Sequence, residues 1–248
     1  MSLRTTTDGQ NQVETEAVDK LRELLKCCKH PYIFLRDLIP YPSGNHLSCK
    51  SRFKVGDLFS TIESNKGLTV SFAKTFSLQL AHALDFLHRN MIVHGFVNAE
   101  NIVVYESQKI AWIQLENFEL ASIVGTENPR RRLKFSPFTP PEVLNDYTMA
   151  SSFSEDNWSF GVVVFSMLTN HFPWRTSQIS DANYKRFVQK VNHCNSFPWH
   201  CFSLKLLGFF TAIFDANPLT RGDATLIFAL VCDFWLADLN PNKTKFKL

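Results

Sequence analysis

The side chains that could do chemistry gather in residues 94–101, which read His-Gly-Phe-Val-Asn-Ala-Glu-Asn. His94 could act as an acid–base catalyst, because a histidine exchanges a proton near neutral pH, although a packed, hydrogen-bonded core histidine is the simpler explanation. Asn101 by itself is most simply a turn or hydrogen-bonding residue. Neither a Ser-His-Asp set nor an arranged pair of carboxylates is evident, so the sequence predicts no hydrolytic site of either kind.

A zinc site is a second chemical possibility, because two His-Cys pairs, His193-Cys194 and His200-Cys201, lie close together in the sequence. Structural zinc sites usually have paired ligands about two to four residues apart, a spacing that these pairs do not follow. Core or loop thiols are the simpler explanation, and we expect no metal. The six cysteines are irregularly spaced, as is typical of reduced thiols rather than of a disulfide framework.

A basic cluster could bind a partner. It reads Pro129-Arg130-Arg131-Arg132 and continues with Lys134. Arginine binds carboxylates and phosphates in a bidentate manner, so the cluster could dock an acidic or phosphorylated protein, although a solvated run of charges on a loop is the simpler explanation. The candidate partner-binding residues are Arg130, Arg131, Arg132, Lys134, Pro137 and Pro140.

The spacing of Lys134, Pro137 and Pro140 also fits the basic-x-x-Pro-x-x-Pro pattern of ligands for SH3 domains. Such a ligand must be free to adopt an exposed polyproline II helix. A segment that packs against the rest of the fold would not be free, and this is the simpler expectation. An SH3 domain stays an open alternative as a partner.

Helices that must position these residues follow from the spacing of apolar side chains. Apolar residues recur every three or four positions over 18–29 and over 69–89, which predicts two amphipathic helices. Asp57 is a suitable N-cap for a further helix. Residues 156–237 predict more helices joined by loops, among them a core helix over 225–236.

Strands are predicted only as short pieces, at 32–38, 92–93, 102–104 and 110–113. The segment 126–141 is polar, rich in proline and arginine, and has no apolar period. It predicts a long ordered loop.

Ordered markers along the chain resemble those of a eukaryotic protein kinase. Residues 94–101 stand where kinases have His-Arg-Asp-Leu-Lys-Pro-Glu-Asn, and residues 117–121, Asn-Phe-Glu-Leu-Ala, stand where they have Asp-Phe-Gly-Leu-Ala. The later markers are Pro140-Pro141-Glu142 for Ala-Pro-Glu, Asp156-Asn-Trp-Ser-Phe-Gly161 for Asp-x-Trp-x-x-Gly, and Arg221 for the late arginine. Phe172-Pro173-Trp174 followed by residues 181–187 is similar to the SH3-binding-domain kinase family.

The resemblance implies an α+β, protein-kinase-like fold, mainly the helical C-terminal lobe with a truncated N-terminal lobe. The expected divisions are a disordered N-terminus at 1–16, a remnant of the N-terminal lobe at 17–55, the C-terminal lobe at 56–238 and a basic tail at 239–248. Neither a Gly-rich loop nor a Val-Ala-Ile-Lys strand is visible upstream. We therefore expect no tight nucleotide binding.

The resemblance assigns structural roles to four residues: His94, Glu142, Asp156 and Arg221. In kinases the glutamate matching Glu142 forms a buried pair with the arginine matching Arg221. The aspartate matching Asp156 binds backbone amides of the catalytic loop. These roles concern the architecture and say nothing for catalysis.

Several catalytic groups of the family are replaced in this sequence. Phosphoryl transfer uses an aspartate that orients the acceptor hydroxyl, a lysine near the phosphate, and an aspartate and an asparagine on magnesium. Phe96 stands for the first aspartate, Asn98 for the lysine and Asn117 for the aspartate on magnesium. Of this set only the asparagine, Asn101, is kept. Gly95 replaces the arginine that holds a phosphorylated activation loop. We therefore predict a catalytically inactive homologue without a cofactor or metal.

Three functions are compatible with this pattern. The first is a pseudokinase that acts as a scaffold or as an allosteric or decoy regulator in phosphorylation signalling, with an active kinase or its substrate as partner. The alternative is an active or atypical ATP-dependent serine/threonine protein kinase with an incomplete N-terminal lobe, in which Glu116 or Glu119 would hold the metal. A degraded product without function is the third, and it predicts poor soluble expression.

Composition and hydropathy argue against a nucleic-acid-binding, membrane-spanning or secreted protein. The 248 residues are 45% hydrophobic with a net charge of +3, which suits a compact domain and, without a basic stripe, argues against nucleic acid. No apolar stretch is long enough to span a membrane, and the first residues lack the apolar core of a signal peptide. We therefore expect a cytoplasmic address, with the nucleus as an alternative.

Overall fold

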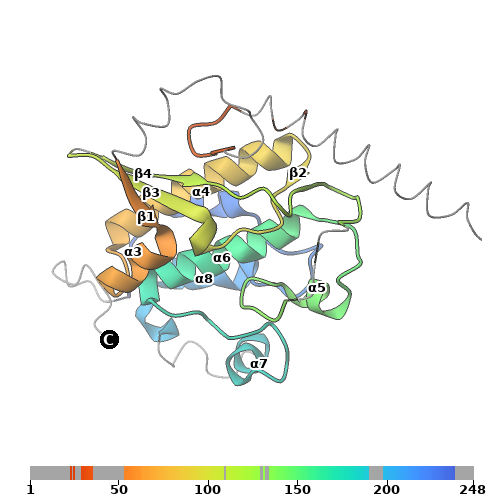
Figure 1. The fold of residues 1–248 in the computed structure, drawn as a ribbon. Coiled ribbons are helices and arrows are strands. Elements are labelled where there is room, and N and C mark those ends of the chain that lie inside the picture. Colours follow the sequence, from red (N-terminus) through yellow and green to blue (C-terminus); the bar gives the residue numbers. More distant parts are fainter. Residues whose placement is uncertain are drawn as a thin grey trace, which may run out of the picture.

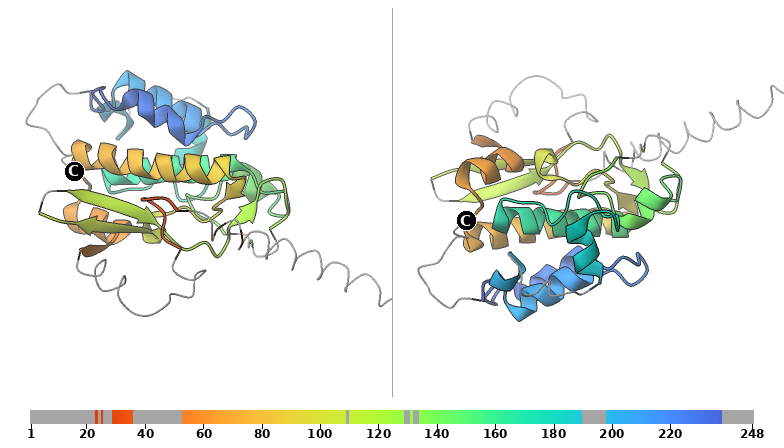
Figure 2. Two further views of the ribbon diagram at one scale, coloured as in Figure 1. Left: turned by 90° about the horizontal axis from the view of Figure 1, so that it is seen from above. Right: turned by 90° about the horizontal axis from the view of Figure 1, so that it is seen from below.

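The protein is seen in a computed structural model that describes residues 23, 25, 29–35, 53–108, 110–128, 131, 134–189 and 198–237. The predictions for residues 1–16, for most of the helix over 18–29 and for residues 239–248 lie outside these residues. Figure 1 shows the order of the elements. Two long helices lie between a small sheet on one side and the C-terminal helices on the other (Figure 2), which agrees with the expected α+β fold.

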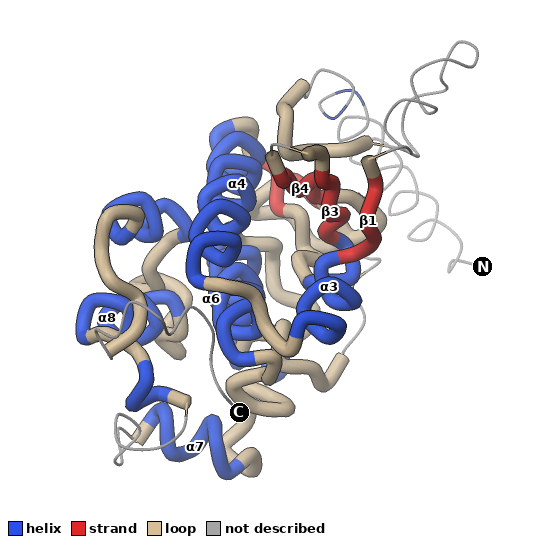
Figure 3. Tube along the Cα trace, turned by 90° about the vertical axis from the view of Figure 1, so that its left-hand side faces the viewer, coloured by secondary structure: helices blue, strands red, loops and turns tan. Residues whose placement is uncertain are grey.

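The two central helices are α4 (Val70–Arg89) and α6 (Phe153–Thr169), which lie side by side (Figure 3). α4 confirms the helix predicted over 69–89, and its N-cap is Thr69, whose side chain accepts a hydrogen bond from the Phe72 amide at 3.4 Å. α6 begins with a capping box in which the side chains of Ser152 and Glu155 satisfy each other's backbone N–H groups. Residues 154–169 are all buried, so α6 forms the centre of the fold.

The main sheet is antiparallel, with strands in the order β1 (Lys54–Asp57), β3 (Ile102–Glu106), β4 (Ala111–Leu115). A smaller ladder joins β2 (Ile92–Val93) to β5 (Ser122–Ile123). These strands confirm the runs predicted at 92–93, 102–104 and 110–113, while β1 and β5 are additional.

Asp57 has two roles, which explains why β1 is not predicted. It ends β1, and its carboxylate then accepts a hydrogen bond from the Ser60 amide at 2.6 Å as the N-cap of α3 (Leu58–Asn65). The helix start is therefore confirmed. The strand before it is too short to show an alternating pattern.

The C-terminal part contains α5 (Pro141–Asn145), α7 (Ala182–Val188) and α8 (Leu204–Ile213), with short 3₁₀ helices η1 (Ala99–Asn101), η3 (Trp199–Cys201) and η4 (Ala224–Leu230). The core helix predicted over 225–236 is wrong in type, because the structure has the 3₁₀ helix η4 followed by turns. Its buried residues, Ala224, Ile227 and Leu230, recur every three positions, which is the period of a 3₁₀ helix. The described residues of the loop predicted over 126–141 contain neither helix nor strand before α5 begins.

Residues 29–35 attach to the edge of β4. Ile33 forms a parallel bridge with Leu115, the Phe34 amide donates to the Leu115 carbonyl at 2.9 Å, and Gln114 Nε2 donates to the Pro31 carbonyl at 2.7 Å. The strand predicted over 32–38 is thus a single bridge in its described part. The predicted domain boundaries at residues 16, 55 and 238 stay predictions.

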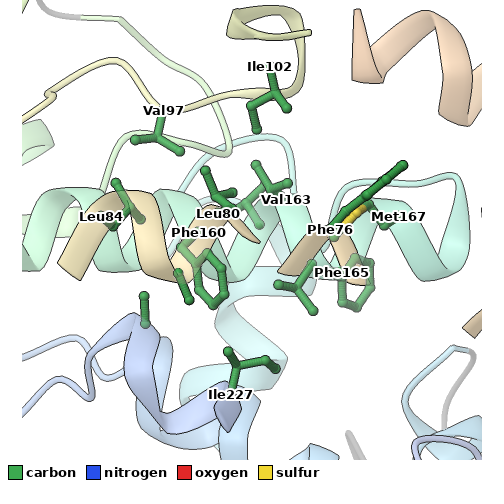
Figure 4. Close-up of a cluster of buried hydrophobic side chains, with 14 of the residues drawn as sticks. Phe76, Leu80, Leu84, Val97, Ile102, Phe160, Val163, Phe165, Met167 and Ile227 are labelled. Atoms are coloured by element: carbon green, nitrogen blue, oxygen red, sulfur yellow. The ribbon is translucent and has the colours of Figure 1, made fainter. Parts of the chain in front are cut away.

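The hydrophobic core fills the space between α4, α6 and η4 (Figure 4). Phe76, Leu80 and Leu84 of α4 face Val163 and Met167 of α6, and all five are at most 2% exposed. An aromatic cluster continues this core on the C-terminal side. It comprises Trp158, Phe165, Trp174, Tyr184, Phe187, Trp199, Phe202, Phe210 and Phe214. Among the described residues, no helix combines the length and apolarity needed to cross a membrane.

Candidate active site

Asp156, in the first turn of α6, fixes the start of the 94–101 loop. Its carboxylate accepts hydrogen bonds from the backbone amides of His94 and Gly95, both at 2.8 Å, and lies 2.9 Å from His88 Nε2. Burial by itself would raise the pKa of Asp156, but the hydrogen bond and charge of His88, and the neighbouring His94, outweigh burial and lower that pKa. The buried carboxylate is therefore ionised and holds the loop backbone, in the role that its kinase counterpart has.

His94 is enclosed in the fold. Its Nδ1 atom accepts a hydrogen bond from the Phe96 amide at 3.2 Å, and its Nε2 atom lies 3.2 Å from the Glu116 carbonyl oxygen. The two contacts together require the neutral tautomer that donates from Nε2. Burial lowers the pKa of His94 and favours the same neutral form. The structure thus places His94 as a packed, hydrogen-bonded residue.

Gly95 and Phe96 lie against the second marker segment. Gly95 has a φ of +68°, and a β-carbon built on it would lie 2.7 Å from the Leu120 carbonyl oxygen. This close approach leaves no room for the arginine that kinases have at the position. The Phe96 ring, in the place of the catalytic aspartate, lies under the Lys134 ammonium group, 5.7 Å from the ring centroid, which is a cation–π geometry.

The asparagines of the site form one hydrogen-bonded set. The Asn98 side chain caps η1 by accepting from the Glu100 and Asn101 amides at 2.9 and 3.0 Å. Asn101 Nδ2 donates to the Phe96 carbonyl at 2.8 Å, and Asn117 Nδ2 donates to Asn101 Oδ1 at 3.1 Å. Asn98 therefore has a capping role, and the substitutions at 98 and 117 leave an ordered loop.

Asn101 and Asn117 are the side chains that could hold a divalent cation. Both amide oxygens already accept a hydrogen bond, from Asn117 Nδ2 and from the Glu119 amide, and neither side chain is a carboxylate, the ligand on which magnesium sites usually rely. The described part of the chain contains no cluster of three or more His, Cys, Asp or Glu that could bind a metal. These residues do not fit a dedicated magnesium site.

The two glutamates named as alternative metal ligands differ in placement. Glu116 is half-buried, and its backbone bonds to His94 and to the Asn101 carbonyl. Glu119 is exposed and lines a cavity. Of the two, Glu119 is the carboxylate that a ligand in the cavity could reach.

This cavity, the acceptor pocket, has a volume of about 540 Å³. One side is the 94–101 loop, from Gly95 to Glu100, and the other is the wall segment, residues 134–140. Five further residues, from α3, α5, α6 and the loop after α6, line the cavity: Phe59, Val143, Glu155, Ser159 and Phe172.

The wall segment is tied to the helical core by three side chains. Trp158 Nε1 donates to the Pro137 carbonyl at 3.0 Å, Ser159 Oγ to the Phe138 carbonyl at 2.9 Å, and Ser177 Oγ to the Thr139 carbonyl at 2.7 Å. Pro140 is buried and Pro137 is half-buried. An SH3 domain could bind the two prolines only if this segment detached.

The basic cluster is divided by the structure. Arg130 and Arg132 lie outside the described residues, and Lys134 is exposed at the pocket. Arg131 is buried, and one nitrogen of its guanidinium donates to both carboxylate oxygens of Glu155, at 2.7 and 2.8 Å. The prediction that Arg131 docks a partner therefore needs correction, because its guanidinium is engaged inside the fold.

Glu142 and Arg221 form the expected pair. Two parallel hydrogen bonds of 2.6 and 2.7 Å join the carboxylate to the guanidinium, and Arg221 also donates to the carbonyls of Ser154 and Asp215. The guanidinium stacks 4.9 Å from the Trp158 ring centroid. The pair joins α5, which follows the wall segment, to the core.

In the second His-Cys pair, His200 Nε2 lies 3.4 Å from Cys201 Sγ. His193 and Cys194 lie outside the described residues. The expectation of no zinc site stays a prediction.

The comparison with known families decides what this arrangement is, because the family model of the protein kinase domain matches residues 4–230. The chain belongs to the protein kinase family. The architectural residues Asp156, Glu142 and Arg221 thus hold loops of a protein kinase domain, and the pocket lies between the segments that match its catalytic loop and its activation segment.

The relatives are kinases by name. The chain is 30% identical over 190 residues to the serine/threonine-protein kinase SBK1 of Danio rerio, covering 74% of this chain and 49% of that protein. It is 31% identical over 180 residues to SBK1 of Mus musculus, covering 70% and 42%. For the serine/threonine-protein kinase chk1 of Schizosaccharomyces pombe, the identity is 24% over 191 residues, covering 77% and 37%. The chain thus spans about half the length of these relatives or less.

These comparisons confirm the resemblance to SH3-binding-domain kinases and correct one prediction. The expectation that the chain is not an enzyme is contradicted, because its relatives are named serine/threonine-protein kinases. That expectation rested on Phe96, Asn98 and Asn117 and on the absence of a Gly-rich loop and a Val-Ala-Ile-Lys strand from the sequence. Two of the replacing side chains, Asn98 and Asn117, are hydrogen-bonded within the site, to the Glu100 amide and to Asn101 Oδ1.

Glu155 lines the pocket, although its sequence context does not indicate this position. The pattern Ser152-x-x-Glu155 predicts the capping box at the start of α6. Its ion pair with Arg131 adds a link to the activation segment, and nothing in the spacing of the two residues indicates it.

Proposed function

We propose that the chain carries the acceptor-binding part of an ATP-dependent serine/threonine protein kinase with an atypical catalytic loop. The observation that carries this proposal is the acceptor pocket of about 540 Å³, in which the 94–101 loop faces the wall segment. A serine or threonine side chain of a protein could enter between them. The names of the relatives support the same activity.

The reaction moves a phosphoryl group to the acceptor hydroxyl, and that hydroxyl must lose its proton. Phe96 cannot accept the proton. Apart from the paired Glu155, the carboxylates that line the pocket are Glu100 and Glu119, and either can accept a proton from a hydroxyl directly or through water. Because the described residues do not fit a magnesium site, the proposal places the acceptor, and not the nucleotide, on these residues.

A phosphotransfer assay tests the proposal. Purified protein is incubated with labelled ATP, magnesium or manganese, and a library of serine and threonine peptides. Glu119→Gln or Glu100→Gln should lower the rate, by up to about 10²–10⁴-fold for the one that is the positioned base, and Phe96→Asp should raise it, because it adds a second group that can accept the hydroxyl proton. Phe135→Asp is the matched control, because Phe135 lies in the wall segment, is 62% exposed and does not line the pocket. No transfer by either the natural protein or the Phe96→Asp variant would refute the proposal.

A second candidate function is the docking of a protein in phosphorylation signalling. Four phenylalanines line the pocket, Phe59, Phe96, Phe138 and Phe172, and an apolar side chain of an active kinase or of its substrate would fit such a surface. Phe96→Asp separates the two functions, because it should weaken docking of an apolar group while it raises phosphotransfer. Pro137→Ala in the same binding assay tests an SH3 domain as the partner.

A further inference from the structure

Arg131 has the most extensive set of contacts among the basic residues of the pocket. One of its terminal nitrogens donates to both carboxylate oxygens of Glu155, at 2.7 and 2.8 Å, and to Ser151 Oγ at 3.1 Å. The other donates to the Met149 carbonyl at 2.8 Å. The two charged side chains are 8% and 9% exposed. A buried ion pair whose members make additional hydrogen bonds fixes geometry better than an exposed pair.

Glu155 and its neighbour Asp156 hold opposite sides of the acceptor pocket. Glu155 binds Arg131, three residues before the wall segment, and also accepts from the Ser152 amide at 2.9 Å in the capping box. Asp156 binds the amides of His94 and Gly95. One turn of the most buried helix therefore anchors both the loop and the wall between which the pocket lies.

The charge that holds this activation segment is therefore a carboxylate within the fold. At position 95 no cationic side chain is present to bind a phosphate, and the Leu120 carbonyl occupies the space that one would need. Phosphorylation orders loops by creating new arginine–phosphate contacts. Here the arginine already has a partner in the Glu155 carboxyl group, which is anionic above its raised pKa of about 7.

We propose that Arg131 and Glu155 are a positioning pair that keeps the wall of the acceptor pocket in place without phosphorylation of the activation segment. The inference rests on the proposed function, because the wall segment is one side of the proposed acceptor site. The pair acts through the wall segment and touches no reacting atom. Its loss should therefore raise the KM for the peptide while kcat changes little.

Hydrogen exchange of the whole protein tests the pair without relying on catalysis. Amides of the wall segment should exchange equally slowly before and after phosphatase treatment. Arg131→Gln and Glu155→Gln should each speed that exchange about tenfold or more, the effect of losing a charge-assisted hydrogen bond. Arg89→Gln is the matched control, because Arg89 pairs with Asp85 at 3.0 Å on the exposed surface. Slow exchange of the α4 amides shows that a variant is still folded. If a glutamine variant does not fold, Arg131→Lys is measured in its place.

The outcomes separate the two proposals. Faster exchange after phosphatase treatment, or unchanged exchange in both glutamine variants, would overturn the positioning pair. If phosphotransfer is absent from the natural protein while exchange behaves as expected, the proposed function fails and the structural effect of the pair remains. If phosphotransfer is present, a rise in peptide KM confined to the Arg131 and Glu155 variants supports both.

Discussion

The carbonyl oxygen of Leu120 occupies the space that a side chain on residue 95 would need. The contact from a β-carbon would be 2.7 Å, and the φ of Gly95 is +68°. Left-handed backbone costs most residues about 1–2 kcal/mol, and this contact is to backbone, which cannot rotate away. Glycine at this position is therefore required by the way in which the two marker segments meet.

Gly95→Ala should lower the free energy of unfolding by roughly 1–3 kcal/mol. Gly125→Ala is the matched control, because Gly125 has a similar φ of +77° and no atom lies within 4 Å of its β-carbon position. Gly125→Ala should lower the free energy of unfolding only by the cost of placing alanine at a positive φ. Urea unfolding of the three proteins measures the difference. Equal losses in both variants would mean that Leu120 moves aside.

The sequence predicts the partners of some side chains of the site and not of others. Glu142 and Arg221 are predictable, because each occupies a marker position with a fixed partner in the kinase fold. Arg131 is not, because Arg130, Arg131 and Arg132 are equivalent in the sequence. Only the path of the loop decides which of them turns inward to Glu155.

Among the elements, η4 shows how the burial pattern of a 3₁₀ helix, with a period of three residues, differs from that of an α-helix. Ala224, Ile227 and Leu230 are buried, and Leu226 is 41% exposed. The Asp223 side chain caps the segment by accepting from the Thr225 amide at 2.8 Å. The run of apolar residues after Thr225 predicts a buried helix, but it does not reveal the helix type, because composition alone does not distinguish periods of 3.0 and 3.6.

Ile227→Ala should lower the free energy of unfolding by about 2–5 kcal/mol, since it leaves a cavity against α4. Leu226→Ala should lower it by about 1 kcal/mol or less, because much of that side chain is already in water. Thermal or urea unfolding of both variants checks the contrast. Similar losses would show that Leu226 is as well packed as Ile227, contrary to the three-residue period.

The elements also differ in how far the sequence predicts them. α4 is predicted because twenty residues of one amphipathic pattern are a strong local signal. β1 and the bridge at Ile33 are not defined by their own residues. They exist because β3 and β4 present unpaired backbone groups to them, and such partners are known only when the chain is folded.

At the scale of the whole molecule, stability depends on titratable groups buried around the start of α6. Burial raises the pKa of Glu155 to about 7, against the attraction of Arg131. The pKa values of His94 and Asp156 are lowered. These groups respond to pH in opposite directions. A group whose pKa is raised by folding stabilises the folded state at low pH, and a group whose pKa is lowered by folding stabilises it at high pH.

The contribution of Glu155 to stability should fall as the pH rises from about 4.5, the ordinary pKa of the group, to about 7. In this window the folded protein keeps a proton that the unfolded chain has released. The free energy of unfolding therefore falls by up to about 1.4 kcal/mol for each pH unit of increase. Glu155→Gln should lack this slope and keep the contributions of His94 and Asp156. Urea unfolding across the window compares them, and parallel curves would contradict the raised pKa.

The aromatic cluster described above has an optical consequence. Trp158 and Trp174 have ring centroids 5.3 Å apart, and Trp199 joins them through Phe187. Chromophores held so closely in a fixed, chiral arrangement couple their electronic transitions and give strong circular dichroism in the near ultraviolet. This signal disappears when side chains lose their fixed positions, even where helices persist. Since Trp158 also binds the Pro137 carbonyl, the natural spectrum of the protein should change when the wall segment leaves the core, without any added label.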